Sequence, residues 1–352
     1  MEFYSLPISA LEKTTEDCTI VTLGVSEQLK NEFQFTQGQY LTFKAMVDGE
    51  ELRRSYSLCS SPLDGEWKIG VKKIQDGRFS SFVNDQLQIG DKIEVAPPAG
   101  KFFVPIEQDK ERAFVAFAAG SGITPMVSII KTHLREEPTS TFKLFYVNRT
   151  VSSIILKEEL EALKNQYMER FEVFYILDEE KRNVELLSGR LDEHKLKDIF
   201  NGLCDVEDIN EVFICGPQPM IFGIRDFLVS KGLSEQRIHF ELFGTPVQAK
   251  KKIEAKYEGK TSDITIHEGG KTLDFKAPQG KEPILDGALR NAADLPFACK
   301  GGVCCTCKAK LVEGTVDMLV NYALEEDEVK DGFILTCQAV PTSDRVVVDF
   351  DV

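Results

Sequence analysis

Residues 298–307 of the chain read ACKGGVCCTC, and a further cysteine, Cys337, follows in the same C-terminal region. Cys299, Cys304 and Cys307 have the spacing C-x4-C-x2-C, which, with a distant fourth cysteine, is typical of plant-type [2Fe–2S] centres. The glycine pair in this loop can turn backbone N–H groups toward sulfur, because glycine tolerates unusual backbone angles. The pattern therefore predicts a two-iron cluster held by these four cysteines.

Two other interpretations of the cysteines stay open. Structural zinc usually takes paired C-x2–4-C clamps that lie far apart, whereas three of these thiols share one short loop. Unligated buried thiols would not explain the clustering. Cys305 falls outside the ligand spacing and is expected to be a packed side chain. The chain has nine cysteines, an odd number, and no visible secretory signal, so a disulfide framework is not expected.

Upstream of this loop, residues 113–118 (AFVAFA) form a continuous apolar run, as expected of a strand buried on both faces of a parallel sheet. Further runs of this kind alternate with segments of helical periodicity, which is typical of a doubly wound α/β domain. We expect this domain to span residues 107–245. The expected strands are 113–118, 142–147, 171–177, 212–215 and 238–243. The expected helices are 126–133, 157–165, 193–200 and 220–230.

The first hundred residues have a different pattern, with short segments rich in β-branched and aromatic residues and a hairpin signal at Asp48-Gly49. One short helix is expected after Gly77. A small antiparallel β-barrel over residues 1–106 is the natural solution for such strands. The segments on which this prediction rests are 18–23, 40–43, 67–71 and 92–95.

The C-terminal part is predicted to form an α+β ferredoxin-like domain over residues 262–352, with one helix near 284–291. Residues 246–261 are expected to be a linker, because Gly244-Thr245-Pro246 and Lys250-Lys251-Lys252 interrupt the preceding pattern. The predicted fold class is therefore multidomain: an antiparallel β-barrel, a doubly wound α/β domain and an α+β ferredoxin-like domain.

Composition and charge exclude several classes of partner. The 352 residues suffice for two or three domains. The formal net charge is −15, and an acidic chain repels phosphate backbones, so nucleic acid is not an expected partner. No apolar stretch approaches the roughly 20 residues of a membrane span, and no basic region precedes an apolar run at the N-terminus. We therefore expect a cytoplasmic protein that does not bind a membrane.

Two short motifs in the barrel region point to a flavin. They are Arg54-Ser55-Tyr56-Ser57 and Gly77-Arg78-Phe79-Ser80. Arg54 and the N–H groups of the Gly77 turn can hold a pyrophosphate, while Tyr56 lies against a flat ring and Ser57 hydrogen-bonds it. Each motif alone also fits an ordinary strand end or helix N-cap. Together and in this order they favour a flavin, and the pyrophosphate argues for FAD over FMN.

Two glycine-rich turns in the α/β region point to a nucleotide. Gly120-Ser121-Gly122-Ile123-Thr124-Pro125 follows the first buried strand, and Cys215-Gly216-Pro217 follows a later one. Glycine at the carboxyl end of a parallel strand lets a nucleotide approach the backbone. Tight strand–helix turns use glycine in any case, but two such turns with a cysteine at the same edge are more specific.

With these motifs in this order, the whole chain resembles the ferredoxin–NADP reductase superfamily, in the arrangement with a C-terminal plant-type ferredoxin domain. Within it, the resemblance is strongest to the reductase components that serve ring-1,2-phenylacetyl-CoA epoxidases. Cys305 departs from the usual small residue. The resemblance is carried by RRSYS (53–57), GRFS (77–80), AAGSGITPM (118–126), NRT (148–150), FICGP (213–217) and ACKGGVC (298–304).

The resemblance implies a set of cofactor contacts. The implied FAD contacts are Arg54, Ser55, Tyr56, Ser57, Val71, Lys72, Gly77, Arg78, Phe79 and Ser80. The implied nicotinamide-nucleotide contacts are Gly120, Gly122, Thr124, Pro125, Arg149, Cys215, Gly216 and Pro217. The residues implied to lie at the reacting rings are Thr124, Cys215 and Phe243, although core packing explains Phe243 equally well.

The identity of the electron donor depends on two features. Arg149, at the end of the second parallel strand, is placed to meet a 2′-phosphate, and the resemblance implies NADPH. Asp178-Glu179-Glu180, after the third strand, would repel that phosphate if it faced them, which leaves NADH open. FMN also stays open, because the phthalate-type reductases use it in the same domain order.

These motifs together predict an NAD(P)H-dependent oxidoreductase. NAD(P)H gives two electrons as a hydride and a [2Fe–2S] centre takes one at a time, so a flavin must stand between them. The expected electron acceptor is an oxygenase component, that of the multicomponent phenylacetyl-CoA epoxidase. The alternatives are the reductase of another di-iron or Rieske oxygenase, an electron-transfer subunit that does not use NAD(P)H, and a zinc-stabilised binding module.

Overall fold

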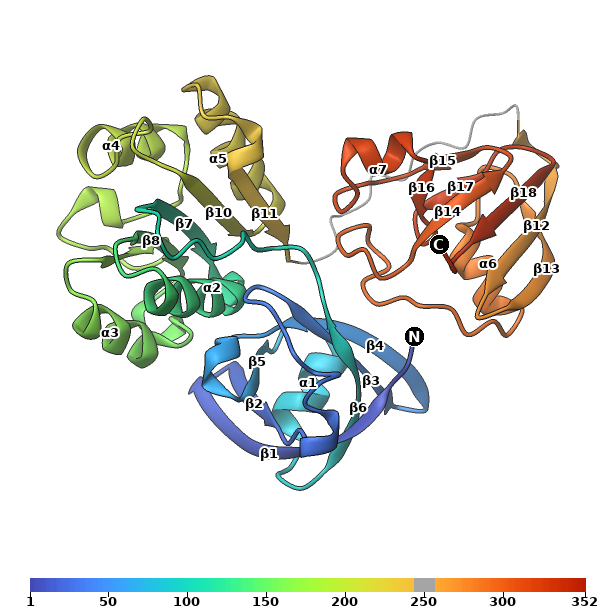
Figure 1. Ribbon diagram of the computed structural model, residues 1–352, viewed down its shortest axis with the longest axis horizontal. Coiled ribbons are helices and arrows are strands. Elements are labelled where there is room, and N and C mark those ends of the chain that lie inside the picture. Colours follow the sequence, from blue (N-terminus) through green and yellow to red (C-terminus); the bar gives the residue numbers. More distant parts are fainter. Residues whose placement is uncertain (244–256) are drawn as a thin grey trace. The chain divides into compact units, whose positions relative to one another are not determined.

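The structure is a computed structural model that describes residues 1–243 and 257–352 (Figure 1). The described residues fall into two compact units, one formed by Glu2–Phe243 and the other by the C-terminal part of the chain. The interruption expected at Gly244-Thr245-Pro246 and at Lys250-Lys251-Lys252 lies outside the described residues. None of the described helices is both long and apolar enough to cross a membrane.

The first half of the larger unit is a six-stranded antiparallel sheet in the order β4-β3-β6-β1-β2-β5. An isolated bridge between Leu58 and Ile69 joins the two ends of this order, so the sheet curls into a barrel. Asp48 and Gly49 both have positive φ at the β3–β4 turn, as a two-residue hairpin requires. The elements are β1 (Tyr4–Thr15), β2 (Cys18–Leu23), β3 (Tyr40–Val47), β4 (Glu50–Ser57), β5 (Trp67–Lys72), α1 (Arg78–Asp85) and β6 (Lys92–Ala99).

The second half of this unit is a five-stranded parallel sheet in the order β11-β10-β7-β8-β9, with helices on both of its faces (Figure 1). The apolar runs of the sequence form its strands, and Phe114 and Phe142 stack with ring centroids 4.4 Å apart. The carboxyl ends of β7, β8 and β10 therefore meet at one edge. The elements are β7 (Ala113–Ala119), α2 (Ile123–Glu136), β8 (Thr141–Asn148), α3 (Lys157–Gln166), β9 (Phe171–Leu177), α4 (Glu193–Gly202), β10 (Glu211–Gly216), α5 (Gln218–Ser230) and β11 (Ile238–Leu242).

Helix α2 attaches the parallel sheet to the barrel. Asp64 accepts hydrogen bonds from Lys131 at 2.7 Å and from Arg135 at 2.5 Å. Nearby, the hydroxyls of Ser61 and Thr132 lie 2.8 Å apart. Since Asp64 and Ser61 belong to the barrel region, these contacts hold α2, and with it the glycine turn after β7, against the barrel.

A buried polar network fixes the C-terminal end of α2. The Glu137 carboxylate is fully buried and accepts hydrogen bonds from Arg112 Nε at 3.1 Å and Ser140 Oγ at 2.7 Å. His133 Nδ1 lies 2.8 Å from the same carboxylate. Burial alone would raise the pKa of Glu137, but hydrogen bonds from His133, Arg112 and Ser140 outweigh it and lower the pKa to about 2. The network ties the segment before β7 to the end of α2.

The C-terminal unit contains a mixed sheet in the order β13-β12-β18-β14-β16 and a two-stranded sheet of β15 and β17. Helix α6 lies against β13, where Gly287 leaves room for the Phe275 ring. Cys307 and Cys337 belong to the hydrophobic core of this unit. The elements are β12 (Thr261–Glu268), β13 (Lys271–Pro278), α6 (Ile284–Arg290), β14 (Lys308–Glu313), β15 (Val316–Met318), α7 (Glu326–Lys330), β16 (Phe333–Leu335), β17 (Ala339–Pro341) and β18 (Arg345–Asp349).

Candidate functional site

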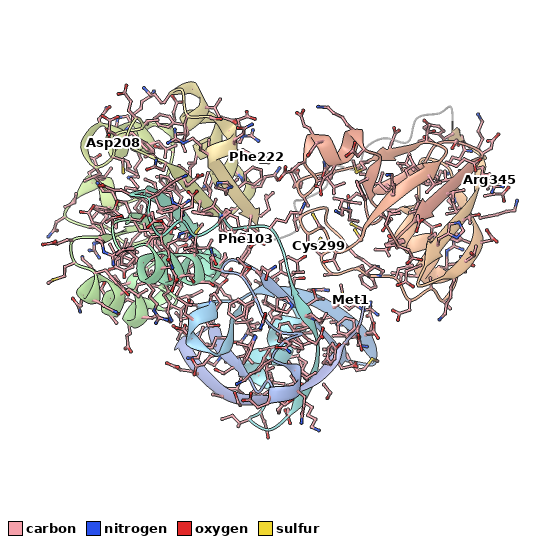
Figure 2. The ribbon with its side chains drawn as sticks, viewed as in Figure 1. Met1, Phe103, Asp208, Phe222, Cys299 and Arg345 are labelled. Atoms are coloured by element: carbon pink, nitrogen blue, oxygen red, sulfur yellow. The ribbon has the colours of Figure 1, made fainter. Side chains whose placement is uncertain are left out.

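The four cysteines of the C-terminal motif gather at the loop between α6 and β14, where Cys299 lies (Figure 2). The sulfurs of Cys299 and Cys304 are 3.1 Å apart, and the Gly301 N–H donates to Cys299 Sγ at 3.3 Å. The Cys307 carbonyl accepts a hydrogen bond from the Thr336 hydroxyl at 3.0 Å, which brings the segment of Cys337 beside it. Three of these thiols are buried and Cys299 is half-buried.

The donor chemistry of this quartet fits a two-iron cluster. Thiol hydrogen bonds from Cys304 and Cys337 lower the pKa of Cys299, and one from Cys337 lowers that of Cys307. The same hydrogen bonds raise the pKa of Cys304 and Cys337, so all four sulfurs lie within contact of one another, as the four ligands of one cluster must. In the described part of the chain, no three His, Cys, Asp or Glu side chains are arranged to hold one single ion. A [2Fe–2S] centre does not need that arrangement, because its four thiolates are shared between two irons.

Cys305 has a different environment from the quartet, as its position outside the spacing suggested. Its thiol donates a hydrogen bond to the Ala323 carbonyl at 3.0 Å. The Lys300 backbone, with φ of 50°, and Gly302, with φ of 73°, form the turn that separates Cys299 from Cys304. At Gly302 a Cβ would lie 3.1 Å from the Val320 carbonyl, so the loop there leaves little room for a side chain.

The predicted flavin residues lie along β4, at the end of β5 and at the start of α1. Tyr56 packs against Phe79, with ring centroids 5.9 Å apart, and burial raises the pKa of the Tyr56 phenol. At the α1 turn, a Cβ on Gly77 would lie 2.4 Å from Ser80 Oγ and 2.3 Å from Ile74. The Ser80 hydroxyl also accepts the Ile74 N–H at 3.2 Å. Only glycine leaves this turn open. An open turn at a helix N-terminus gives a pyrophosphate access to the backbone N–H groups.

Other residues predicted to contact the flavin have partners of their own. Arg54 donates to the Arg53 carbonyl at 2.7 Å, and Ser55 Oγ lies 3.1 Å from Thr42 Oγ1. The Arg78 guanidinium turns to the β3–β4 hairpin, where it donates to Glu50 at 2.5 Å. Val71 and Phe79 are buried in the barrel core, which leaves their backbone groups rather than their side chains for a cofactor.

A cavity of about 550 Å³ opens at the carboxyl edge of the parallel sheet. Lys72 of β5 also lines it, so the structure places this lysine at the nucleotide crevice as well as beside the flavin region. Its ammonium group lies 3.5 Å from Asp17. Of the predicted nucleotide and ring contacts, those that line the cavity are Gly120, Arg149, Gly216, Pro217 and Phe243.

The remaining predicted nucleotide residues are buried and do not line the cavity. At Gly122 a Cβ would lie 2.2 Å from the Cys215 carbonyl, so the two glycine turns touch through their backbones. Burial, and then the charge of Glu241, raise the pKa of the Cys215 thiol. Thr124 Oγ1 donates to the Ser121 carbonyl at 3.0 Å, and the next residue, Pro125, continues α2. These residues therefore adjoin residues that line the crevice, namely Ser121 and Gly216, without lining it themselves.

The structure reveals one further candidate that the motifs did not. Glu241 of β11 pairs in register with Cys215 and accepts a hydrogen bond from Ser57 Oγ at 3.1 Å. The side chain keeps some exposure, yet desolvation of its carboxyl raises the pKa of Glu241 to about 7, against the opposing hydrogen bond from Ser57. A proton-carrying group thus links the barrel motif to the cysteine of the sheet. The only sequence signal was an acidic residue inside an apolar strand.

Replacing Glu241 by glutamine is expected to stabilise the protein at pH 8 and to leave its stability unchanged near pH 4.5. A carboxyl whose pKa is raised in the folded state contributes stability below its unfolded pKa of about 4.5, and that stability is lost as the pH rises through about 7. The gain at pH 8 is up to about 3 kcal/mol. Thermal unfolding of wild type and variant at the two pH values measures this gain in stability. A variant that is no more stable than wild type at pH 8 contradicts the prediction.

Three family models match consecutive parts of the chain. The oxidoreductase FAD-binding domain matches residues 5–104, the oxidoreductase NAD-binding domain matches residues 117–226, and the 2Fe-2S iron-sulfur cluster binding domain matches residues 266–342. With the thiol quartet and the glycine-lined crevice, these matches define an oxidoreductase that combines FAD, a nicotinamide nucleotide and a [2Fe–2S] cluster. They confirm the predicted fold class and cofactor set, and the zinc interpretation is wrong.

Full-length relatives narrow this class. The chain is 41% identical over 350 residues to a component of the 1,2-phenylacetyl-CoA epoxidase of Escherichia coli strain K12, covering 99% of this chain and 98% of that protein. It is 31% identical to the ferredoxin reductase component of 3-ketosteroid-9-alpha-monooxygenase from Rhodococcus rhodochrous, covering 98% and 96%. The solved structure of phthalate dioxygenase reductase aligns with a TM-score of 0.61 and 26% identity, covering 99% and 98%. The chain belongs to the family of reductase components of oxygenase systems.

Proposed function

We propose that this chain takes electrons from NAD(P)H and delivers them to the oxygenase component of a phenylacetyl-CoA epoxidase. When bound, FAD accepts a hydride and releases electrons singly, and the [2Fe–2S] cluster carries one electron at a time. The observation that carries the proposal is the full-length 41% identity to the epoxidase component, joined to a thiol quartet and an open glycine crevice in the same chain.

The proposed cofactor roles follow the placement of the side chains. Cys299, Cys304, Cys307 and Cys337 hold the cluster. Gly120, Gly216 and Pro217 line the crevice and let the nucleotide approach the backbone, while Gly122, Thr124, Pro125 and Cys215 adjoin residues that line it. Phe243 lines the same crevice and would face the reacting rings. The proposed FAD contacts are Arg54, Ser55, Tyr56, Ser57, Val71, Lys72, Gly77, Arg78, Phe79 and Ser80.

Within this proposal, Ser57 and Glu241 would accept the one proton that is left when a hydride is passed on to the cluster as two single electrons. Ser57 ends the strand that carries the flavin motif, and Glu241 lies in register with Cys215, so their hydrogen bond spans the space between the two motifs. With a pKa of about 7, Glu241 can hold or release a proton near neutral pH. No nucleophile is needed, because the chemistry is electron transfer between positioned groups.

The proposal also includes the domain limits and the compartment. We assign residues 1–106 to FAD, 107–245 to NAD(P)H, 246–261 to the linker and 262–352 to the cluster, although Thr261 already begins β12 in the structure. We place the protein in the cytoplasm, because all nine cysteines are free thiols and the proposed cluster ligands must stay reduced.

The proposed function is tested by reconstitution. The purified holoprotein is combined with the oxygenase component of a phenylacetyl-CoA epoxidase, and epoxide formation is measured with NADPH and with NADH. The expected result is turnover that depends on this chain and on reduced nucleotide. If the chain supports only the oxygenase of 3-ketosteroid-9-alpha-monooxygenase, the assigned partner is wrong. If it cannot reduce cytochrome c with either nucleotide, the whole proposal fails.

A further inference from the structure

The outer rim of the nucleotide cavity carries a second arginine that no sequence motif marked. Arg190 lines the cavity of about 550 Å³ together with Arg149 and Asp178. The lining side chains therefore include three cations, Lys72, Arg149 and Arg190, and one carboxylate, Asp178. The excess of positive charge suits a ligand with several phosphate groups.

The backbone holds Arg190 at this position although it follows β9 by more than ten residues. Gly189 donates its N–H to the Leu177 carbonyl at 2.7 Å, and Ser188 forms a parallel bridge to Leu177. The Arg182 N–H donates to Ser188 Oγ at 2.8 Å and closes the intervening loop. Arg190 is therefore held next to the end of β9, at the edge of the sheet where the adenosine half of a nucleotide lies in doubly wound domains.

The two arginines of the rim, Arg149 and Arg190, differ in the partners of their guanidinium groups. Arg149 Nε lies 3.6 Å from the Glu179 carboxylate, and the Glu179 N–H donates to the Arg149 carbonyl at 3.0 Å. In the described residues, no hydrogen bond or ion pair engages the Arg190 guanidinium. Glu179 and Glu180 line a neighbouring cavity of about 640 Å³, and of the three carboxylates after β9 only Asp178 lines the nucleotide cavity.

We propose that Arg190 is the residue that selects the 2′-phosphate of NADPH. The inference rests on the proposed function and adds the nucleotide and the residue that recognises it. The planar guanidinium can give a phosphate two parallel hydrogen bonds. Arg149 is a weaker candidate because the Glu179 carboxylate, which would repel a phosphate, lies 3.6 Å from its guanidinium. Asp178 would repel the phosphate, but the two arginines outnumber it at this rim.

The test measures binding rather than turnover. The holoprotein is titrated calorimetrically with 2′-phospho-ADP-ribose and with ADP-ribose, which differ only in the phosphate. Arg190→Gln is expected to weaken binding of the phosphorylated ligand by roughly 10- to 100-fold, as loss of a charge-assisted hydrogen bond does, and to change ADP-ribose binding less than about threefold. Arg149→Gln is the matched control, and its loss is expected to be several times smaller.

Three outcomes would overturn the inference. The wild-type protein could bind ADP-ribose as tightly as its 2′-phosphate, Arg190→Gln could weaken both ligands alike, or Arg149→Gln could cause the larger loss. Each leaves the proposed function intact, because NADH or another phosphate contact could still serve it. Failure of the proposed function is seen separately, as absence of cytochrome c reduction by the wild-type protein with both NADPH and NADH.

Discussion

Replacing Cys337 by serine is expected to abolish the [2Fe–2S] absorbance and cytochrome c reduction while ferricyanide reduction by NADPH persists. The cluster loses one of its four thiolate ligands, so the loss exceeds the roughly 10- to 100-fold caused by losing an outer hydrogen-bond partner of a metal site. The flavin and nucleotide residues belong to the other compact unit, so they are expected to keep their activity. Iron content, visible spectra and the two acceptor assays measure the result.

Cys305→Ser is the matched control for this prediction. The Cys305 thiol donates to the Ala323 carbonyl at 3.0 Å, and a serine hydroxyl can make the same hydrogen bond. This variant should therefore keep its iron and its cytochrome c reduction. If instead Cys305→Ser loses iron and Cys337→Ser retains it, the assigned ligand set is wrong. If Cys337→Ser also loses ferricyanide reduction, the two units do not work independently.

Replacing Glu137 by alanine is expected to lower the free energy of unfolding by about 3 kcal/mol at pH 7, because the buried Arg112 charge loses its buried partner and keeps only the more exposed Glu107 carboxylate, 3.2 Å away, among the described residues. Since the pKa of Glu137 is lowered to about 2, its contribution is complete above its unfolded pKa of about 4.5. It is lost as the pH falls from about 4.5 to about 2. The difference between wild type and variant should shrink over that range. Urea unfolding followed by circular dichroism, at pH 7 and at lower pH, measures both effects.

Glu136→Ala provides the control for the Glu137 experiment. Glu136 occupies the adjacent position, and the one hydrogen bond that its carboxylate accepts from the described residues is an exposed one from Gln108 at 2.9 Å. Its loss should change the free energy of unfolding by no more than about 0.5 kcal/mol, as is usual for surface positions. Equal losses in the two variants, or a loss below about 1 kcal/mol for Glu137→Ala, would show that the buried network does not stabilise the start of the parallel sheet.

The parallel sheet was predictable from the sequence because strands that are buried on both faces have continuous runs of apolar residues. Each predicted strand and helix between residues 113 and 243 appears in the structure within a few residues of its expected limits. Strand β1 was missed. Its inward residues Leu6 and Ile8 alternate with polar positions, but Pro7 breaks the pattern and suggests a turn. In the structure Pro7 offers no N–H to the sheet, but its carbonyl still accepts the Gly24 N–H at 2.8 Å, and the strand continues through it.

The candidate sites were predictable where their residues lie close together in the sequence, and not where they lie far apart. The cysteine quartet could be predicted because three of its thiols lie in one loop with a diagnostic spacing. The Ser57–Glu241 hydrogen bond joins residues 184 positions apart, and no local motif announces it. Arg190 was also invisible, because only the bridge between Ser188 and Leu177 brings it to the crevice. Sites whose residues are brought together only by the tertiary structure can be recognised only once the fold is known.

The number of electrons that one chain accepts tests the central claim most directly. Under anaerobic conditions the holoprotein is titrated with a chemical reductant while the visible absorbance of flavin and cluster is followed. An FAD that takes two electrons and a [2Fe–2S] centre that takes one predict about three electron equivalents per chain. An end point at about two equivalents, with no iron-dependent bleaching, would show that the four cysteines hold no cluster and would contradict the account.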